Sequence, residues 1–335
     1  NSIMILITGG AGFIGANLIK ELNQKKNTDI IIVDNIKKNK KNLNKLKFKD
    51  YYDKDDFFKK INKNKFKENI DCIIHLGACS DTTENNWDYL KYNNIIYTKK
   101  LYELSLNNNC QFIYASSASI YGKNNGSTLL NNFDHKPLNL YGKSKLEIDK
   151  FFFRNKKKKV IGLRFFNVYG KYEDHKQNMC SPVSKFTKQL KKDGFLNLFK
   201  FKSKDEPSRD FIFIDDVINI MQFLKNKNKL GLYNIGTGEP QTFINVAEIL
   251  LKNLGYGEIN FIKFPEYLRN KYQYYTKANI SKLKKLGYSN KIKNLENGIK
   301  KYLNIWNFDN FYFKIILFFY KLYYQFQVFI KYNYR

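Results

Sequence analysis

A short apolar segment followed at once by evenly spaced glycines limits most strongly what this chain can fold into. Residues 3–8 form an apolar run of strand length, and Gly9, Gly12 and Gly15 follow it, ahead of a helix-like stretch to about residue 25. Glycines at this spacing let the backbone approach a phosphate group that rests on a helix N-terminus. The segment therefore predicts a strand, a phosphate-binding loop and a helix, in that order.

Short apolar strands and helix-length stretches continue to alternate after this loop. The strands are expected at residues 30–33, 72–76, 112–115 and 160–166, and the helices at residues 84–106 and 141–153. Apolar runs without polar alternation are typical of parallel strands that are covered on both faces, and strands that alternate with helices are typical of a doubly wound sheet. We therefore predict an α/β fold with a Rossmann-type doubly wound parallel sheet.

The sequence changes character near residue 168, which predicts a second, smaller unit. We expect residues 1–168 to form a dinucleotide-binding domain, with residues 210–238 returning to its sheet. Residues 169–209 and 239–310 are expected to form a discontinuous α/β substrate-binding domain, which closes over the carboxyl edge of the strands.

The last segment, residues 311–335, is an aromatic and basic extension to which we assign no role. Lys314, Lys321 and Lys331 interrupt any span of the ~20 apolar residues that are needed to cross a bilayer. Contact with a membrane surface and packing on a partner both stay open for this segment.

The net charge of the chain suggests a nucleic-acid or membrane partner, but the distribution of the charge does not. The 335 residues include 59 Lys and Arg against 30 Asp and Glu, a formal net charge of +29. Nearly all of the excess is lysine, spread along the chain and accompanied by many Asn, Ile, Phe and Tyr residues, whose codons are rich in A and T. We attribute the charge to mutational bias and expect no nucleic-acid partner.

Cysteine and histidine are too sparse for a disulfide framework or a metal site. The four cysteines form no C-x-x-C pair, and the three histidines are scattered. We interpret His75 and His135 as structural and expect no bound metal. No basic leader or cleavage site accompanies the first apolar run, which predicts a cytoplasmic protein.

A tyrosine and a lysine four residues apart are the second feature that carries chemistry. On a helix Tyr141 and Lys145 share one face, so the ammonium group can stabilise a phenolate whose ordinary pKa is about 10. A cationic, oxidised nicotinamide would lower that pKa further. The tyrosinate can then accept the proton of a substrate hydroxyl as hydride leaves the same carbon, while Ser117 holds the oxygen. We therefore predict Ser117, Tyr141 and Lys145 as catalytic residues.

The residues after the second strand bear on which nicotinamide dinucleotide is bound. Asp34, about 20 residues beyond the glycine loop, favours a free ribose 2′-hydroxyl and hence NAD. Several lysines could instead neutralise a 2′-phosphate and permit NADP. They are Lys37, Lys38, Lys40, Lys41 and the more distant Lys54. The residues alone leave both cofactors open.

Several further motifs occur together in this chain. They are the segments 8–15, 33–35, 75–84, 114–118, 166–170 and 209–217, the pair His175-Lys176 and the pair Tyr272-Gln273. With the Ser-Tyr-Lys group, the first and last of these segments resemble the extended short-chain dehydrogenase/reductase superfamily. The others are similar to the ADP-L-glycero-D-manno-heptose 6-epimerase family, a likeness that covers roughly residues 3–310.

This resemblance implies an NADP-dependent epimerisation at C6″ of ADP-D-glycero-β-D-manno-heptose through a transient 6″-ketone. The product is a precursor of the lipopolysaccharide inner core. Lys176 is implied as a second acid/base catalyst, on the face of the substrate opposite to Tyr141. The resemblance also implies a homo-oligomer, which in this family is a pentamer.

The resemblance and the glycine loop together define the residues expected in the site. Those expected at the cofactor are Gly9, Gly12, Phe13, Ile14, Gly15, Asp34, Asn35, Lys41, Lys54, Asn93, Tyr141 and Lys145. Those expected at the ADP-heptose are Ser117, Asn167, His175, Arg209 and Tyr272. Arg209 would donate bidentate hydrogen bonds to diphosphate oxygens. Lys271 stands where the family usually has an arginine, and it lacks the planar fork that grips phosphate.

Three other functions share part of this pattern. A sugar-nucleotide dehydratase needs acid/base carboxylates beside its active serine or threonine, but Ser117 is followed by Ala118 and Ser119. A UDP-hexose 4-epimerase uses the same Ser-Tyr-Lys chemistry and is the main alternative. A non-catalytic dinucleotide-binding protein would need the glycine loop but not an intact Ser117, Tyr141 and Lys145.

Overall fold

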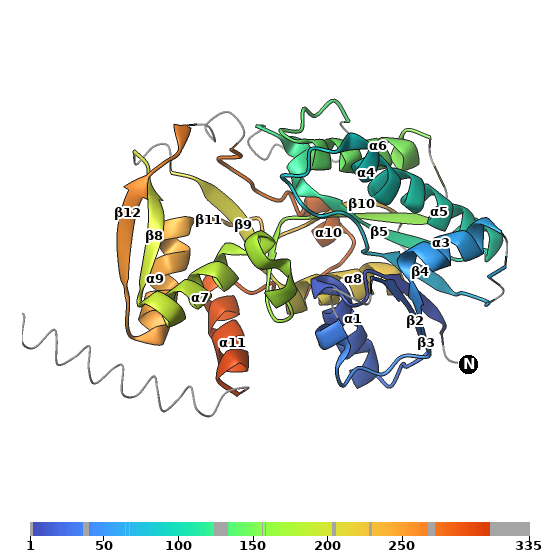
Figure 1. Ribbon diagram of the computed structural model, residues 1–335, viewed down its shortest axis with the longest axis horizontal. Helices are drawn as coiled ribbons and strands as arrows, with labels where there is room; N and C mark the ends of the chain where they lie inside the picture. The colour runs from blue at the N-terminus through green and yellow to red at the C-terminus, as the bar shows by residue number, and fades with distance from the viewer. Residues whose placement is uncertain are drawn as a thin grey trace, which may run out of the picture.

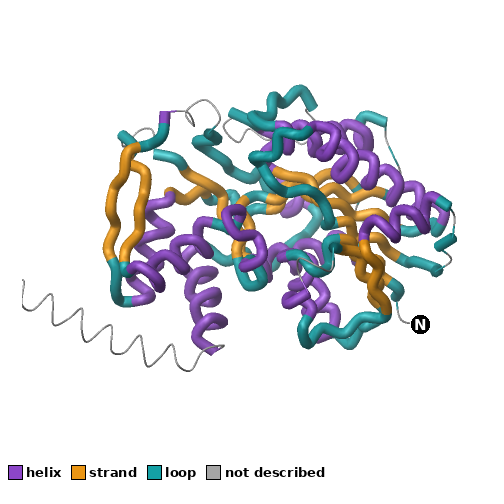
Figure 2. The backbone as a smooth tube through the Cα atoms, in the orientation of Figure 1, coloured by secondary structure: helices purple, strands orange, loops and turns teal. Residues whose placement is uncertain are grey.

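A parallel sheet with helices on both faces is the largest element of the structure (Figures 1 and 2). Its seven strands are β1 (Ile5–Thr8), β2 (Ile30–Asp34), β3 (Asp50–Asp53), β4 (Cys72–His75), β5 (Gln111–Ser117), β6 (Val160–Phe165) and β10 (Gly231–Ile235). They lie in the order β10-β6-β5-β4-β1-β2-β3. The computed structural model describes residues 3–35, 40–63, 65–66, 68–123, 133–155, 157, 159–202, 206–227, 230–266 and 272–308. The predicted α/β class and doubly wound sheet are confirmed.

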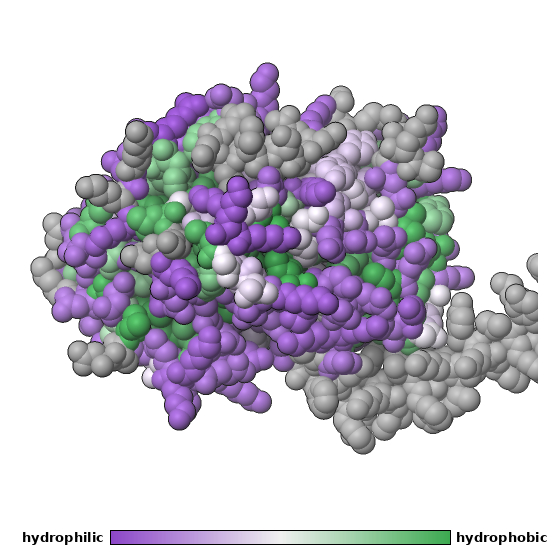
Figure 3. Space-filling model, turned by 180° about the vertical axis from the view of Figure 1, so that it is seen from behind, coloured by the Kyte–Doolittle hydropathy of each residue, from purple (hydrophilic) through white to green (hydrophobic). Residues whose placement is uncertain are grey.

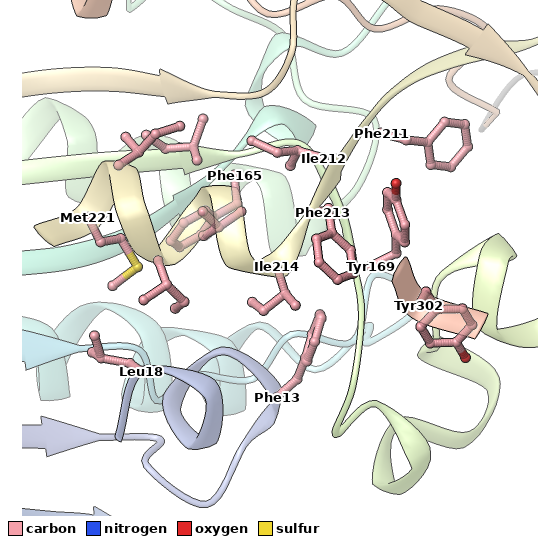
Figure 4. Packing of buried hydrophobic residues seen from close by; sticks show 14 of the residues in the cluster. Phe13, Leu18, Phe165, Tyr169, Phe211, Ile212, Phe213, Ile214, Met221 and Tyr302 are labelled. Carbon is pink, nitrogen blue, oxygen red and sulfur yellow. The ribbon is translucent and has the colours of Figure 1, made fainter. Parts of the chain in front are cut away.

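Helices α1 (Phe13–Gln24) and α8 (Ile214–Asn226) cover one face of this sheet and pack on each other. Ile7 of β1, Leu18 of α1 and Met221 of α8 belong to one buried cluster, part of which is drawn in Figure 4. Successive side chains of a strand point to opposite faces, so every second strand residue joins this cluster.

The other face of the sheet is covered by a longer series of helices. They are α3 (Lys54–Asn62), α4 (Trp87–Leu90), the π-helical segment η2 (Lys91–Ile96), α5 (Tyr97–Asn107) and α6 (Leu140–Phe153). Leu6 of β1 packs in a second buried cluster with Phe57 and Phe152 from these helices. The helices predicted at 84–106 and 141–153 are both present, the first with a π-helical stretch at its centre.

A smaller part of the chain lies beside the large sheet (Figure 1). It has a three-stranded sheet in the order β11-β9-β7 and a two-stranded parallel sheet of β8 and β12. These strands are β7 (Asn167–Tyr169), β8 (Phe195–Lys200), β9 (Ser208–Phe213), β11 (Pro240–Thr242) and β12 (Glu258–Lys263). The remaining helices are α7 (Pro182–Asp193), α9 (Phe243–Leu254), α10 (Ser281–Lys285) and α11 (Leu295–Phe308), and the 3-10 turns are η1 (Lys40–Leu43), η3 (Ala118–Tyr121) and η4 (Asp174–Met179).

The strand expected near residue 210 does not join the large sheet, so its predicted placement is wrong. The segment that was expected to return to the large sheet near residue 210 is β9, which pairs with β7 and β11 instead. The chain rejoins the large sheet only at β10, after α8 has packed on α1. β9 is nearly all buried, and a buried apolar run has the same appearance in either sheet.

Three features of the described residues concern possible membrane or metal partners: the surface, the helices and the side chains that could bind a metal. Figure 3 shows that hydrophilic residues cover most of one face, with hydrophobic residues in separate, smaller areas. Among the helices that the structure describes, none is long and apolar enough to span a bilayer. The same residues contain no group of three His, Cys, Asp or Glu side chains that could hold a metal ion. Lys37, Lys38, Lys271 and the extension 311–335 lie outside the described residues.

Candidate active site

The glycine loop joins β1 to α1 at the carboxyl edge of the sheet. Gly9 has φ +70° and its N–H donates to the Val33 carbonyl oxygen at 2.8 Å. A Cβ on Gly9 would lie 2.5 Å from the Gly77 nitrogen, and a Cβ on Gly15 would lie 2.2 Å from the Gly9 oxygen. Both positions therefore require glycine, because the backbone segments approach too closely for a side chain.

The outer side of this loop fits a dinucleotide. A Cβ on Gly12 would approach only the Gly9 carbonyl group, at 3.1 Å to its oxygen. Gly12 caps α1 without a side-chain hydrogen bond, and the first turn of α1 has no acidic residue. The N–H groups that begin α1, at Phe13 and Ile14, thus meet no competing carboxylate from that turn, as a helix that binds a pyrophosphate requires.

Asp34 lies at the end of β2, next to the glycine loop. Its Oδ2 accepts the Ala11 N–H at 2.9 Å, and its Oδ1 accepts the Asn35 N–H at 2.7 Å. Burial raises the pKa of Asp34, and these backbone N–H groups oppose that rise. The structure therefore brings Asp34 and Asn35 to the loop where the sequence places the cofactor.

Two more of the expected cofactor residues contact each other. Lys54 Nζ, at the start of α3, donates to Asn93 Oδ1 on η2 at 3.0 Å. Lys41 is exposed on η1, after the strand that ends in Asp34. Lys41 and Lys54 lie on segments that follow strands β2 and β3, and Asn93 lies on η2. The contact of these three residues with the cofactor stays a prediction.

The Ser-Tyr-Lys group is assembled by β5 and α6. Asn139 caps α6 by accepting the Gly142 N–H at 2.8 Å, which places Tyr141 in the first turn. Tyr141 shares a hydrogen bond with Ser117, the last residue of β5. Lys145 Nζ donates to the Ala115 carbonyl oxygen at 2.9 Å and lies 5.9 Å from the centroid of the Tyr141 ring. The three residues are together, as the sequence predicts.

Burial dominates the electrostatics of this group. Burial raises the pKa of Tyr141 above its ordinary value of 10, and the bond with Ser117 lowers it only in part. Burial also lowers the pKa of Lys145 to about 8, which Asp149 and Cys79 oppose. Burial therefore sets the direction of the Tyr141 shift, because removing a phenolate from water disfavours its charged form.

A buried ion pair lies under α6, the helix of Tyr141 and Lys145. Arg164 Nε donates to Asp149 Oδ2 at 2.8 Å, and neither side chain is exposed. Tyr114 OH donates to Asp149 Oδ1 at 2.6 Å. Asp149 lies one turn beyond Lys145 on α6, so the pair joins this helix to β5 and β6.

The loop after β4 is held by buried side chains. His75 Nδ1 lies 2.6 Å from Thr8 Oγ1 and its Nε2 lies 2.8 Å from Thr98 Oγ1. Burial lowers the pKa of His75 to about 3, so the ring is neutral and serves the packing, in agreement with its structural interpretation. Asn94 Oδ1 accepts the Cys79 N–H at 2.8 Å and its Nδ2 donates to Ser144 Oγ at 2.9 Å, which ties this loop to α6.

Lys176 reaches the glycine loop from another segment. Its Nζ lies 5.4 Å from the centroid of the Phe13 ring, at the start of α1. The buried carboxylate of Glu173 shapes this segment, because it accepts the Gly170 N–H at 2.9 Å and the Ser181 N–H at 2.6 Å. Lys176 thus lies beside the first residue of α1, whereas Tyr141 lies on α6 and contacts Ser117 at the end of β5.

Arg209 and Tyr272 form a second cationic part of the site. The guanidinium carbon of Arg209 lies 5.3 Å from the centroid of the Tyr272 ring, and burial lowers the pKa of Arg209. Asn167 begins β7, which pairs with β9, the strand of Arg209. Gln273 Nε2 donates to the Gly122 carbonyl oxygen at 3.0 Å, which links this part to the turn after Ser117.

Comparison with known proteins identifies the family to which this chain belongs. The sequence profile described as the NAD dependent epimerase/dehydratase family matches residues 5–236. The ADP-L-glycero-D-manno-heptose-6-epimerase of Alkalilimnicola ehrlichii is 40% identical over 311 residues, which cover 90% of this chain and 97% of the relative. The chain belongs to the ADP-L-glycero-D-manno-heptose-6-epimerase family. It is therefore an enzyme, an isomerase of the epimerase type.

Solved structures agree with this assignment. The ADP-L-glycero-D-manno-heptose-6-epimerase of Helicobacter pylori matches with a TM-score of 0.77 and 29% identity, covering 90% of this chain and 96% of that one. The UDP-glucuronic acid 4-epimerase of Bacillus cereus matches with a TM-score of 0.72 and 26% identity, covering 90% and 98%, and was solved with UDP-glucuronic acid and NAD. This epimerase thus uses a nicotinamide dinucleotide, and the glycine loop fits one.

Sequence reasoning missed several residues that shape the epimerase site. Asp210 accepts the N–H groups of Thr237, Gly238 and Ala278 at 2.7, 2.8 and 2.9 Å, which fixes three loop residues around the strand of Arg209. Arg164 had a visible signal, since it is a charged residue inside an otherwise apolar strand. No sequence signal distinguishes Asn94 from its neighbour Asn93, because both have the same side chain and only the fold determines which partners each one contacts.

Proposed function

We propose that this epimerase interconverts ADP-D-glycero-β-D-manno-heptose and ADP-L-glycero-β-D-manno-heptose by inverting C6″, with NADP as cofactor. The observation that carries the proposal is that the Lys176 ammonium group, on η4, lies 5.4 Å from the centroid of the Phe13 ring at the start of α1, whereas Ser117, Tyr141 and Lys145 come from β5 and α6. When the ketone turns over between the two hydride transfers, its oxygen moves away from the first proton-transfer group, and a second group on the other side can then donate the proton.

The residues divide the proton transfers as follows. Tyr141 accepts the proton of the C6″ hydroxyl of the D-glycero epimer, and Ser117 holds that oxygen by a hydrogen bond. When bound, an oxidised nicotinamide supplies reversible hydride exchange at C6″ and a positive charge that favours the Tyr141 phenolate. The 6″-ketone then turns over within the site, and Lys176 donates a proton to its oxygen as the opposite face is reduced; before the next turnover Tyr141 releases its proton to water and Lys176 takes one up from water. The substrate undergoes no net change in redox state.

The proposal of NADP is supported by the contacts of Asp34. Both carboxylate oxygens already accept backbone N–H groups, from Ala11 and Asn35. Lys41 is exposed on the turn that follows β2, where a cationic side chain would favour a ribose 2′-phosphate. NAD is the alternative. The ratio of kcat/KM with NADP bound to kcat/KM with NAD bound distinguishes the two cofactors when it is measured in the wild type and in Lys41→Met.

We further propose that the two parts of the chain divide the binding task, with the large sheet holding the cofactor and the smaller part holding the ADP-heptose. Arg209, in contact with Tyr272, would bind the diphosphate, and Asn167 and His175 would contact the sugar. The family resemblance supports a cytoplasmic homo-oligomer, a pentamer, that supplies lipopolysaccharide precursors.

The test is NMR of the purified protein with ADP-D-glycero-β-D-manno-heptose and catalytic NADP, with UDP-galactose in a parallel sample and Tyr141→Phe as the inactive control. We expect conversion to the L-glycero epimer that is lost in Tyr141→Phe. Turnover of UDP-galactose alone would move the assignment to a hexose 4-epimerase. Bound cofactor without turnover of either sugar would refute the proposed reaction.

A further inference from the structure

A side chain that the proposed reaction does not use joins the glycine loop to the segment of Lys176. Asn42 lies on η1 and is buried. Its Nδ2 lies 2.9 Å from the Ala11 carbonyl oxygen, 3.0 Å from His175 Nδ1 and 3.4 Å from the Tyr172 carbonyl oxygen. One amide nitrogen thus contacts both the loop at the cofactor and the residue before Lys176.

The chemistry of these contacts fixes their direction. Carbonyl oxygens only accept hydrogen bonds, so Asn42 presents its NH2 group, and His175 Nδ1 must accept and carries no proton. Burial, the largest cause, and the charge of Lys176 lower the pKa of His175, whereas a hydrogen bond with the Tyr172 backbone and the charge of Asp174 oppose this; the net lowering agrees with a neutral ring. An amide nitrogen has two hydrogens, so the 3.4 Å approach to Tyr172 is the weakest of the three contacts.

The two segments do not depend equally on Asn42. The Ala11 N–H is held by Asp34 Oδ2 at 2.9 Å, so the glycine loop keeps an anchor when Asn42 is changed. The segment of Lys176 keeps the hydrogen bonds of the Glu173 carboxylate with the Gly170 and Ser181 N–H groups, and Asn17 Nδ2 donates to the Lys171 carbonyl oxygen at 2.8 Å, but none of these contacts joins His175 to the glycine loop. His175 itself would lose its contact with the loop, and Lys176 is the next residue.

We propose that Asn42 is a positioning residue that fixes Lys176 against the glycine loop through His175, and so controls proton transfer on the Lys176 side of the reaction alone. The proposal rests on the proposed function, in which the L-glycero epimer gives its hydroxyl proton to Lys176 and the D-glycero epimer gives its proton to Tyr141. It predicts an asymmetry between the two epimers that a purely structural role would not produce.

The experiment uses two substitutions and a matched control. Asn42→Asp keeps the shape of the side chain and removes both donors, and Asn42→Ala removes the whole amide. Asn44→Ala changes an exposed asparagine in the turn that follows η1. Rapid mixing of the NADP-loaded enzyme with each epimer separately measures the first formation of reduced nicotinamide, and calorimetry measures the Kd of NADP.

We expect both Asn42 variants to reduce the cofactor about 100-fold more slowly with the L-glycero epimer, since misplacing a reacting group by ~1 Å costs about that factor. With the D-glycero epimer, and in the Kd of NADP, we expect changes below about threefold. Asn44→Ala should match the wild type in every measurement.

Equal slowing with both epimers, or a wild-type rate in Asn42→Asp with the L-glycero epimer, would overturn the role of Asn42. If the Asn42 variants fail to fold, Asn17→Ala replaces them and must show the same asymmetry at smaller size. Failure of the proposed function has a different signature: the wild type itself would reduce no cofactor with either heptose, and the positioning role would then be refuted with it.

Discussion

The two proposed proton-transfer sides of the site are built in different ways. Tyr141 and Lys145 lie on α6, and Ser117 ends a central strand of the large sheet, so regular backbone hydrogen bonds hold this side in place. Lys176 lies in a short 3-10 segment that depends on the buried carboxylate of Glu173 and on side-chain amides. Groups on regular elements are held more firmly than groups on loops.

Because of this difference, we expect single substitutions to have different effects on the two sides. On the Tyr141 side, a change that moves the catalytic group must disturb a helix or a strand, and it therefore also lowers the free energy of unfolding. On the Lys176 side, the loss of one hydrogen bond can move the catalytic group while the fold stays intact.

The removal of the Tyr141 hydroxyl should have the largest effect on activity. Tyr141→Phe loses the proton acceptor and the bond with Ser117, and we expect kcat for epimerisation to fall by about 10³-fold or more. NMR of the heptose mixture measures the rate, and calorimetry of NADP binding confirms that the site is intact. Retention of a tenth of wild-type activity would remove Tyr141 from the role of base.

The buried pair beneath α6 should have the largest effect on stability. Asp149→Asn leaves the Arg164 guanidinium buried without its carboxylate, and we expect the free energy of unfolding to fall by about 3–5 kcal/mol. Urea denaturation measures it. Glu147→Gln, on the more exposed side of the same helix, is the matched control and should change it by less than ~1 kcal/mol. Equal effects of both substitutions would contradict the rigid construction of this side.

The loss of the second acid/base group should slow one half of the reaction. In Lys176→Met we expect epimerisation to fall by about 10²-fold, whereas the first reduction of NADP by the D-glycero epimer keeps its rate because Tyr141 is untouched. Stopped-flow absorbance separates the two steps. Lys185→Met, an exposed lysine on α7, is the control. A loss of cofactor reduction with both epimers would show that Lys176 serves binding and not proton transfer.

The neutral His75 predicts how stability depends on pH. Because burial lowers its pKa from 6.5 to about 3, the unfolded chain binds a proton that the folded chain does not, and stability falls as pH falls between these values. The contribution of His75 at pH 5 should be about 2 kcal/mol less than at pH 7. Urea denaturation at both pH values tests this, and His75→Gln should reduce the difference by that amount. A pH difference that is unchanged in His75→Gln would contradict a buried neutral ring.

The sequence was sufficient for features that depend on local spacing. The glycine loop, the doubly wound sheet and the shared face of Tyr141 and Lys145 follow from periodicity and from an i, i+4 relation. The placement of β9 does not follow from the sequence, because an apolar run does not indicate which sheet the strand joins.

Features that depend on distant contacts were beyond the sequence. Asn42 and His175 are 133 residues apart, and in a chain rich in Asn nothing marks Asn42 as special. The rise in the pKa of Tyr141 also escaped prediction, because it depends on how completely the folded chain excludes water from the ring.

The most direct test of the central claim is epimerisation of ADP-D-glycero-β-D-manno-heptose in D2O, followed by NMR of the hydrogen at C6″. A hydride that leaves C6″ and returns to its other face does not exchange with water, whereas a proton removed by a base does. We predict conversion to the L-glycero epimer with hydrogen retained at C6″. Deuterium at C6″ of the product, or no conversion of this substrate, would contradict the account.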